Sequence, residues 1–160
     1  MIKITEKLLD QKQADLIEEK MTSNIFGWFI TKGIVYRHED NYQFTHNFYD
    51  IFQPRSNYME LINPIVKKIN PSSIIRIKAN LIPKTKNIIE TNLHKDIGHA
   101  KGNKTAIYYV NTNNGYTEFE NENKVNCIAN SMLIFKANNK HRGCSQTDSD
   151  YKSVININFK

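Results

Sequence analysis

A histidine and an aspartate stand two residues apart, as His94 and Asp96, at the end of an apolar and β-branched run. On a strand, residues i and i+2 project from the same face, so these two side chains can reach one ion together. A neutral imidazole and a carboxylate are both good ligands for divalent transition metals. The spacing therefore predicts part of a metal site.

The remaining ligand must come from another part of the chain. His141 is the only histidine after His99, and it follows the apolar segment 132–137, MLIFKA. Two histidines and one carboxylate on one octahedral face hold Fe(II) and leave three positions open, enough for a bidentate 2-oxo acid and dioxygen. The sequence thus predicts His94, Asp96 and His141 as metal ligands.

A 2-oxo dicarboxylic acid bound in this way would carry a second carboxylate. In a partly dry pocket that group needs a cation to offset its desolvation. Lys152 stands eleven residues after His141, at the start of the last predicted strand. A hairpin of that length returns it to the same end of a barrel, which makes Lys152 the natural counter-charge.

The sequence also contains a second histidine–aspartate pair of the same spacing, His38 and Asp40. This rival pair could use His94 as its distal ligand. We reject it because a predicted helix, and not a run of strands, fills much of the sequence between His38 and His94. His46 and His99 have no partner at metal spacing. His99 is interpreted as a solvated turn residue or as a residue at the mouth of the site.

The first part of the chain is predicted to be helical. Thr5 is a candidate cap for a helix whose apolar positions recur at helical spacing: Leu8, Leu9, Leu16, Ile17 and Met21. A second helix is expected over 56–70, with Pro64 kinking it or starting a new first turn. Between the two helices, 26–37 is typical of a strand pair with a turn near Lys32-Gly33.

From Ser72 onward the pattern is one of short strands separated by Gly, Pro and Asn turn signals. The expected strands are 73–82, 87–94, 104–112, 115–121, 123–130, 132–137 and 151–159. Strands of this number and spacing behind two helices predict a mainly β fold with N-terminal helices. We expect a jelly-roll barrel with the helices packed on one sheet.

Two of these strands have one apolar and one polar face, because successive side chains point to opposite sides. Along 151–159 and along 75–81, every second residue is polar apart from Val154: Lys152, Asn156 and Asn158 in the first strand, and Arg76, Lys78 and Asn80 in the second. The polar face could line a wet cleft, or it could be a solvated outer face.

The composition fits one domain over 1–160, with helical support over 1–71 and a jelly-roll core over 72–160. The net charge of +6 comes from scattered lysines, which permits nucleic-acid binding without indicating it. The two cysteines are expected to be buried or bystander thiols. The charged N-terminus and the absence of a long apolar run predict a cytoplasmic protein with no membrane partner.

The segments between the proposed ligands carry a resemblance to a known family. TAIYYVN at 105–111, NGYTEF at 114–119 and MLIFKANNKHRG at 132–143 match, in order and spacing, the motifs of prolyl-4-hydroxylase-type 2-oxoglutarate/Fe(II) dioxygenases. That family shows HxD, a Tyr-containing strand, a Gly-rich hairpin, an apolar strand, the distal His and then an Arg or Lys. The resemblance covers about residues 74–159 and implies the double-stranded β-helix form of the jelly-roll.

The resemblance implies roles for individual residues. Fe(II) would be held by the three predicted metal ligands, and Lys152 would clamp the distal carboxylate of the cosubstrate 2-oxoglutarate. Tyr109 matches the family's strand tyrosine, which commonly hydrogen-bonds the same carboxylate; alternatively it only fills the barrel. Thr105 shares the face of Tyr109 and borders the pocket, and Arg76 and Asn80 are further pocket candidates. The resemblance also allows ascorbate to serve as a reductant.

Two positions depart from the family pattern. Asn130-Ser131 stands where the family usually has a glycine, and Asn114-Gly115 replaces a double glycine. The second departure is expected to require only that Asn114 adopt a positive φ, which asparagine tolerates. Neither position touches a predicted ligand.

The predicted reaction is hydroxylation of a substrate with decarboxylation of 2-oxoglutarate to succinate. A protein side chain such as a prolyl residue is favoured as substrate by the resemblance, a nucleic-acid base is permitted by the charge, and a small metabolite would need a closed pocket. The competing hypotheses are a non-catalytic jelly-roll binding module and a cupin-like enzyme with another metal, which would not need Lys152. The sequence does not predict an oligomeric state.

Overall fold

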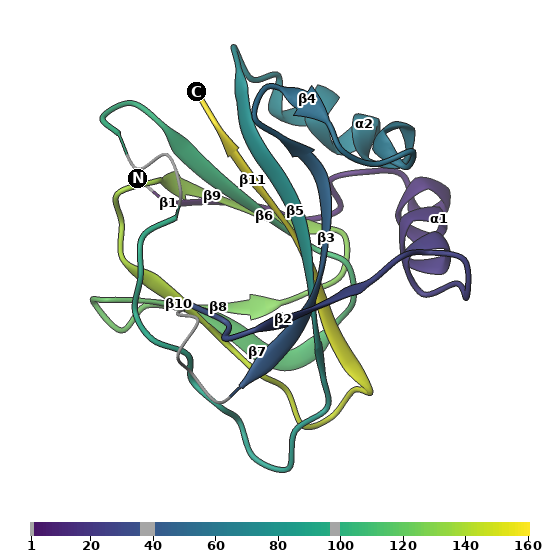
Figure 1. Ribbon diagram of the computed structural model, residues 1–160. Coiled ribbons are helices and arrows are strands. Elements are labelled where there is room, and N and C mark those ends of the chain that lie inside the picture. Colours follow the sequence, from purple (N-terminus) through teal and green to yellow (C-terminus); the bar gives the residue numbers. More distant parts are fainter. Residues whose placement is uncertain (1, 36–40, 97–99) are drawn as a thin grey trace.

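The computed structural model describes residues 2–35, 41–96 and 100–160. The chain forms two facing β-sheets with two helices on the outside of the larger one (Figure 1). In chain order the elements are β1 (Ile2–Thr5), α1 (Gln11–Met21), β2 (Phe29–Lys32), β3 (Tyr42–Asp50), β4 (Gln53–Pro54), α2 (Met59–Ile69), β5 (Ile74–Pro83), β6 (Lys104–Tyr109), β7 (Asn113–Phe119), β8 (Lys124–Cys127), β9 (Ser131–Lys136), β10 (His141–Cys144) and β11 (Tyr151–Phe159).

All strand pairs are antiparallel. The large sheet has the order β1-β9-β6-β11-β5-β3-β2, with β4 paired to β3, and the small sheet has the order β10-β7-β8. β11 lies in the middle of the large sheet, between β5 and β6, in register with both over most of its length. This arrangement confirms the predicted mainly β jelly-roll with helices packed on one sheet.

Two hydrophobic clusters explain the layering. The larger one joins the helices to the outer face of the large sheet, where Ile17 and Ile62 meet Ile77 and Ile155. The smaller one lies between the two sheets and contains Tyr109, Phe119 and Phe135 among others. The apolar face of β11 is therefore covered by helices, and its opposite face points to the inside of the barrel.

The start of α1 differs from the prediction. Thr5 belongs to β1, which pairs with β9, and the helix is capped by Asp10, whose side chain accepts a 3.0 Å hydrogen bond from the amide of Gln13. Asparagine and aspartate are strong N-caps because they satisfy the free amides of the first turn. The apolar spacing located the helix correctly, but residues 2–5 pair with β9 at the edge of the large sheet and do not cap the helix.

The second helix forms in the predicted region but begins at Met59, and it continues through Pro64 without a new first turn there. It ends at Asn70, which adopts a left-handed conformation with φ 50°. A left-handed residue directly after the last turn is a common way to stop a helix.

Several strand predictions need correction. β2 pairs with β3, not with the residues directly after Gly33, and β1 to β4 extend the large sheet within 1–71, which the sequence division treats as helical support. Residues 87–94 form only isolated bridges, at Glu90 and His94. The strand β10 was not predicted at all, because turn-forming residues surround it.

The two departures from the family pattern have different structural reasons. Asn130 adopts φ 57°, so this position needs a conformation that glycine or asparagine tolerates. The prediction for Asn114 was wrong, because it is not among the positive-φ residues of the described chain. Its neighbour Gly115 is needed for space: a Cβ there would lie 2.9 Å from the carbonyl oxygens of Cys144 and Ser145.

Both cysteines are free and buried, as predicted. Among the described residues, the helices are too short and too polar to span a bilayer.

Candidate metal centre

The two candidate histidines are neighbours across a short backbone bridge. The amide of His94 donates to the carbonyl of His141 at 2.9 Å, and the amide of His141 donates back at 3.0 Å. His141 is the first residue of β10, while His94 lies in the irregular segment that follows β5. This reciprocal bridge brings residues 47 positions apart into contact, with ring centroids 4.7 Å apart.

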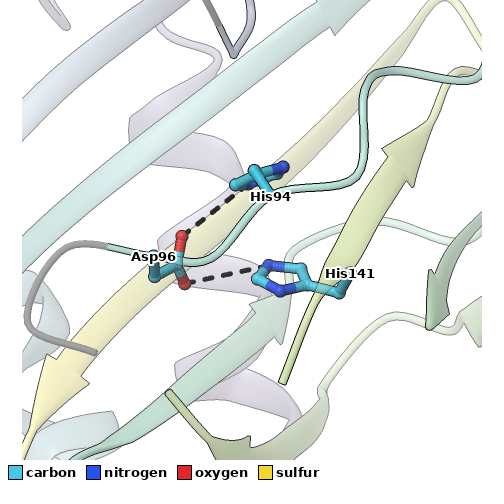
Figure 2. A group of neighbouring side chains, drawn as sticks. All are labelled: His94, Asp96 and His141. Carbon is cyan, nitrogen blue, oxygen red and sulfur yellow. Dashed lines mark ion pairs between the residues drawn. The ribbon is translucent and has the colours of Figure 1, made fainter. Parts of the chain in front are cut away.

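Asp96 completes a group of three possible ligands. One carboxylate oxygen lies 3.8 Å from Nε2 of His94, and the other lies 3.8 Å from Nε2 of His141 (Figure 2). The three ligand atoms all lie within 4.8 Å of one another. Ligand atoms bound at roughly 2.0–2.2 Å from a common ion stand about 3 Å apart, so a small approach would suffice to hold a divalent cation.

Both imidazoles are held in the orientation that a metal ligand needs. Nδ1 of His94 lies 3.0 Å from the carbonyl of Asn92, and Nδ1 of His141 lies 3.2 Å from the carbonyl of Asn139. A proton on Nδ1 satisfies each carbonyl and leaves the lone pair of Nε2 directed at the centre. Burial lowers the pKa of His141, which favours this neutral form, although Asp96 acts in the opposite direction.

The carboxylate of Asp96 is buried and is supported by β11. Nδ2 of Asn158 donates to Oδ2 of Asp96 at 3.3 Å and to Oγ1 of Thr105 at 3.1 Å. Asn158 is fully buried. Sequence reasoning placed Asn158 on the polar face of the last strand but gave it no role, and its contact with Asp96 depends on tertiary structure.

Lys152 lies inside the barrel, with its side chain 4% exposed. Its ammonium group donates to the carbonyl of Cys144 at 2.6 Å and to that of Tyr116 at 3.1 Å. An ammonium group has three donors; two are used by the small sheet, and the thiol of Cys127 also interacts with the ammonium group. Within the described part of the chain, no carboxylate forms an ion pair with Lys152.

The metal group and Lys152 share one cavity of about 250 Å³ between the two sheets. The polar faces of β5 and β11 form part of its wall, which is one of the two alternatives that the alternation in those strands left open. The residues that line it are Ile34, Val35, Gln43, Arg76, Lys78, Asn80, Ile82, Thr91, His94, Lys95, Asp96, Ile107, Thr117, His141, Gly143, Lys152, Val154 and Asn156.

The other predicted pocket residues lie at different depths. Asn80 lines the cavity, as does Arg76. Tyr109 is completely buried and donates from its hydroxyl to Oγ1 of Thr117 at 2.8 Å, so it reaches the cavity wall only through Thr117. Burial raises the pKa of the Tyr109 phenol. Thr105 is not among the lining residues but accepts from Asn158, behind Asp96.

His46, the other histidine within the described residues, does not join this group. His46 is buried elsewhere, with Nδ1 2.6 Å from the carbonyl of Gly27 and Nε2 2.7 Å from the hydroxyl of Ser56. Both ring nitrogens are therefore satisfied by structural contacts. The rival pair His38 and Asp40, together with His99, lies outside the described residues.

The fold of this chain is shared with solved 2-oxoglutarate- and iron-dependent oxygenases. One is the viral collagen prolyl hydroxylase of Paramecium bursaria Chlorella virus-1, solved with 2-oxoglutarate, with a TM-score of 0.67 at 11% identity over 98% of this chain and 93% of that chain. Another is a prolyl hydroxylase from Trichoplax adhaerens, solved with a peptide of a hypoxia-inducible factor, with a TM-score of 0.67 at 11% identity over 99% and 82% of the two chains.

A third similar structure has a different substrate class. The α-ketoglutarate-dependent epimerase SnoN of nogalamycin biosynthesis has a TM-score of 0.72 at 12% identity, covering 99% of this chain and 77% of that chain. No family model matches the sequence, and no curated protein matches it significantly. The fold is thus that of the 2-oxoglutarate/Fe(II) oxygenases, a resemblance in three dimensions that agrees with the sequence motifs.

Proposed function

We propose that this protein is a 2-oxoglutarate- and Fe(II)-dependent dioxygenase. The observation that carries the proposal is that one cavity contains both a group of two histidines and one carboxylate and a buried lysine without a carboxylate partner among the described residues. The first feature suits Fe(II), and the second suits the distal carboxylate of a 2-oxo dicarboxylic acid. Placing three candidate metal ligands and a buried lysine around one cavity does not stabilise a core, because buried charges without partners are unfavourable.

The donor set fits the metal. His94 and His141 would supply neutral Nε2 atoms and Asp96 a carboxylate oxygen, a 2-His-1-carboxylate set with open positions. When bound, Fe(II) with 2-oxoglutarate supplies the activation of dioxygen, with release of succinate and carbon dioxide and transfer of one oxygen atom to the substrate. The protein's own part is to fix the ligands, exclude water and orient both substrates.

Individual residues divide that work. The carbonyls of Asn92 and Asn139 fix the two imidazole rings, and Asn158 holds the carboxylate of Asp96. Such outer-shell partners typically change metal affinity by about 10–100-fold. Lys152 would clamp the distal carboxylate of 2-oxoglutarate. Tyr109 would act indirectly, by orienting the hydroxyl of Thr117 at the cavity wall.

The class of substrate is a further part of the proposal. A protein side chain, such as a prolyl residue, is supported by the sequence motifs and by the structural similarity to an enzyme solved with a peptide. A base of a nucleic acid and a small metabolite are alternatives, the latter supported by the similarity to an epimerase of a biosynthetic pathway. Location in the cytoplasm belongs to the same proposal.

The test is direct. Anaerobic protein with Fe(II) and 2-oxoglutarate is expected to show the weak visible charge-transfer absorption of the chelate, and to release succinate slowly when air is admitted. Panels of peptides, oligonucleotides and metabolites would then be screened for faster succinate release. Protein that binds neither Fe(II) nor 2-oxoglutarate would instead be a non-catalytic binding module.

A further inference from the structure

The wall of the cavity formed by β5 carries two cationic side chains that the proposed reaction does not use. Arg76 and Lys78 alternate with the buried residues Ile77 and Ala79, which pack against the helical layer. This alternation turns both cations toward the inside of the barrel, where both line the cavity. Each is only partly exposed.

Neither cation has an anionic partner in direct contact within the described residues, where the ion pairs involve other side chains. Nε of Arg76 is buried without any hydrogen-bond partner. Burial, the largest cause, and the neighbouring charge of Arg76 together lower the pKa of Lys78 to about 8, against an opposing effect of Asp96. Keeping two poorly solvated cations side by side is unfavourable because of desolvation and mutual repulsion. A bound anion would reduce both of these unfavourable free energies.

Binding of the metal and cosubstrate would not supply that anion. The charges of a divalent metal ion, dianionic 2-oxoglutarate, Asp96 and Lys152 cancel as a set, and the distal carboxylate of 2-oxoglutarate is assigned to Lys152. Asp96, the negative charge that acts on both Arg76 and Lys78, is already counted in that set, and Asp50 remains as a second carboxylate acting on Arg76. The loaded site would therefore retain two positive charges on the β5 wall.

The same wall has other unsatisfied polar atoms. The side-chain oxygens of Asn80 and Asn156 are buried without a hydrogen-bond partner, and both residues line the cavity. Asn156 is opposite Lys78 in the register of β11 and β5. Buried polar atoms in native proteins almost always have partners, and these two oxygens are acceptors, so they indicate that the ligand also carries a hydrogen-bond donor besides any anionic group.

We propose that Arg76 and Lys78 bind a carboxylate of the substrate, carried either by a free acid or by an acidic group of a peptide. The inference rests on the proposed function, because it assigns the Lys152 end of the cavity to the cosubstrate. A guanidinium group beside an ammonium group suits a planar carboxylate, which accepts two parallel hydrogen bonds from arginine. A neutral prolyl ring alone would leave both cations unpaired.

Matched probes test the charge independently of the true substrate. Protein loaded with Mn(II) and 2-oxoglutarate, which does not turn over, is titrated at fixed ionic strength with propionate or propionamide. Parallel titrations use blocked Gly-Asp-Gly or Gly-Asn-Gly peptides and inorganic phosphate. The readouts are the melting temperature and calorimetric binding. The acid of at least one pair is expected to bind about 10-fold or more tightly than its amide. The pair that responds distinguishes a free acid from a peptide.

Variants assign the effect to the wall. Arg76→Met and Lys78→Met are each expected to abolish the preference for acid over amide and to raise the melting temperature of the ligand-free protein, because each removes a desolvated charge. Both should keep their affinity for 2-oxoglutarate within about threefold. Lys152→Met should keep the preference for acid over amide and lose affinity for 2-oxoglutarate. Lys86→Met, at an exposed lysine, should change neither the preference nor that affinity.

Three results would overturn the inference. They are an equal response to acid and amide in the wild type, a response to phosphate alone, or a loss of 2-oxoglutarate affinity in Arg76→Met and Lys78→Met as large as in Lys152→Met. The same titrations on metal-free protein separate the two proposals. An acid preference that depends on Arg76 and Lys78, in protein that binds no 2-oxoglutarate even when Fe(II) or Mn(II) is added, would support the anion site and reject the dioxygenase.

Discussion

His94 and His141 are joined through their backbones as well as placed side by side, because each donates its amide hydrogen to the carbonyl of the other. The bridge links an irregular segment to the first residue of β10 at the point where both side chains face Asp96. Two of the three proposed ligands are thus positioned by main-chain bonds that a side-chain substitution leaves in place.

Removing either imidazole is therefore expected to remove metal binding without unfolding the protein. His94→Ala or His141→Ala should weaken Fe(II) or Mn(II) binding more than 100-fold, since even outer-shell changes cost about 10–100-fold. Calorimetry with Mn(II) measures the affinity, and circular dichroism checks the fold. His38→Ala, in the rival pair, should bind like the wild type; a loss of metal in that variant would favour the rival pair.

Replacing Lys152 should affect the cosubstrate and spare the metal. Lys152→Met is expected to raise the dissociation constant of 2-oxoglutarate by about 10–100-fold, because a charge-assisted hydrogen bond contributes about 1.5–3 kcal/mol. Mn(II) affinity should change little. The measurement is titration of 2-oxoglutarate into Mn(II)-loaded protein, with Lys86→Met as the matched control. Unchanged affinity in Lys152→Met would assign the clamp to another cation.

Asn158 is expected to act on the metal through Asp96. Asn158→Ala removes the hydrogen bond to Oδ2 and should weaken Mn(II) binding by about 10-fold, with a smaller effect than the loss of a ligand. Ser153→Ala, on the same strand, is the control, because Ser153 is buried but does not line the cavity. Equal metal affinity in the two variants would show that Asp96 needs no support from β11.

Lys78 should make stability depend on pH in a defined direction. Its folded-state pKa is about 8, below the unfolded value, so between about pH 8 and pH 10 the unfolded chain binds more protons than the folded chain. The free energy of unfolding contributed by Lys78 therefore rises with pH across that window, by up to about 3 kcal/mol. Urea unfolding of wild type and Lys78→Met at pH 7.5 and 9.5 measures the difference. If the two proteins change in parallel, the lysine is not desolvated.

Asn130 should be important for stability although it touches no ligand. It adopts φ 57°, its side chain bonds both the amide and the carbonyl of Leu9, and its Oδ1 accepts from Tyr108 at 3.3 Å. Asn130→Ala should cost about 2–4 kcal/mol in unfolding free energy. Asn130→Gly should cost about 1 kcal/mol less, because glycine adopts the positive φ without strain. Equal losses would mean that the hydrogen bonds alone determine the effect.

The sequence predicted those features that depend on local pattern. Alternation along β5 and β11 separated an apolar from a polar face and left open whether the polar face lined a cleft, and the helical spacing of Leu16, Ile17 and Met21 located α1. Spacing also selected His94 and Asp96 as candidates, on the premise of a strand that the structure replaces with an irregular segment. These inferences needed no knowledge of distant contacts.

Other features depend on contacts between segments far apart in the chain. Thr5 has a good capping side chain, yet residues 2–5 pair with β9, and pairing with a distant strand is not encoded in local propensity. β10 is surrounded by turn-forming residues and exists because β7 and the His94 segment lie beside it. The support of Asp96 by Asn158 and the juxtaposition of Arg76 with Lys78 around one cavity likewise required the tertiary structure.

The length of β10 has a consequence for which dicarboxylic acids can bind. Cys144, the carbonyl of which holds Lys152, lies three positions after His141, a distance of roughly 10 Å along a strand. Hydrogen bonding to β7 keeps this spacing rigid, and Gly115 lets the two strands approach without a side chain between them. The strand would therefore fix the distance between the metal site and the ammonium group of Lys152. Homologues of 2-oxoglutarate that are one methylene shorter or longer should not match that distance.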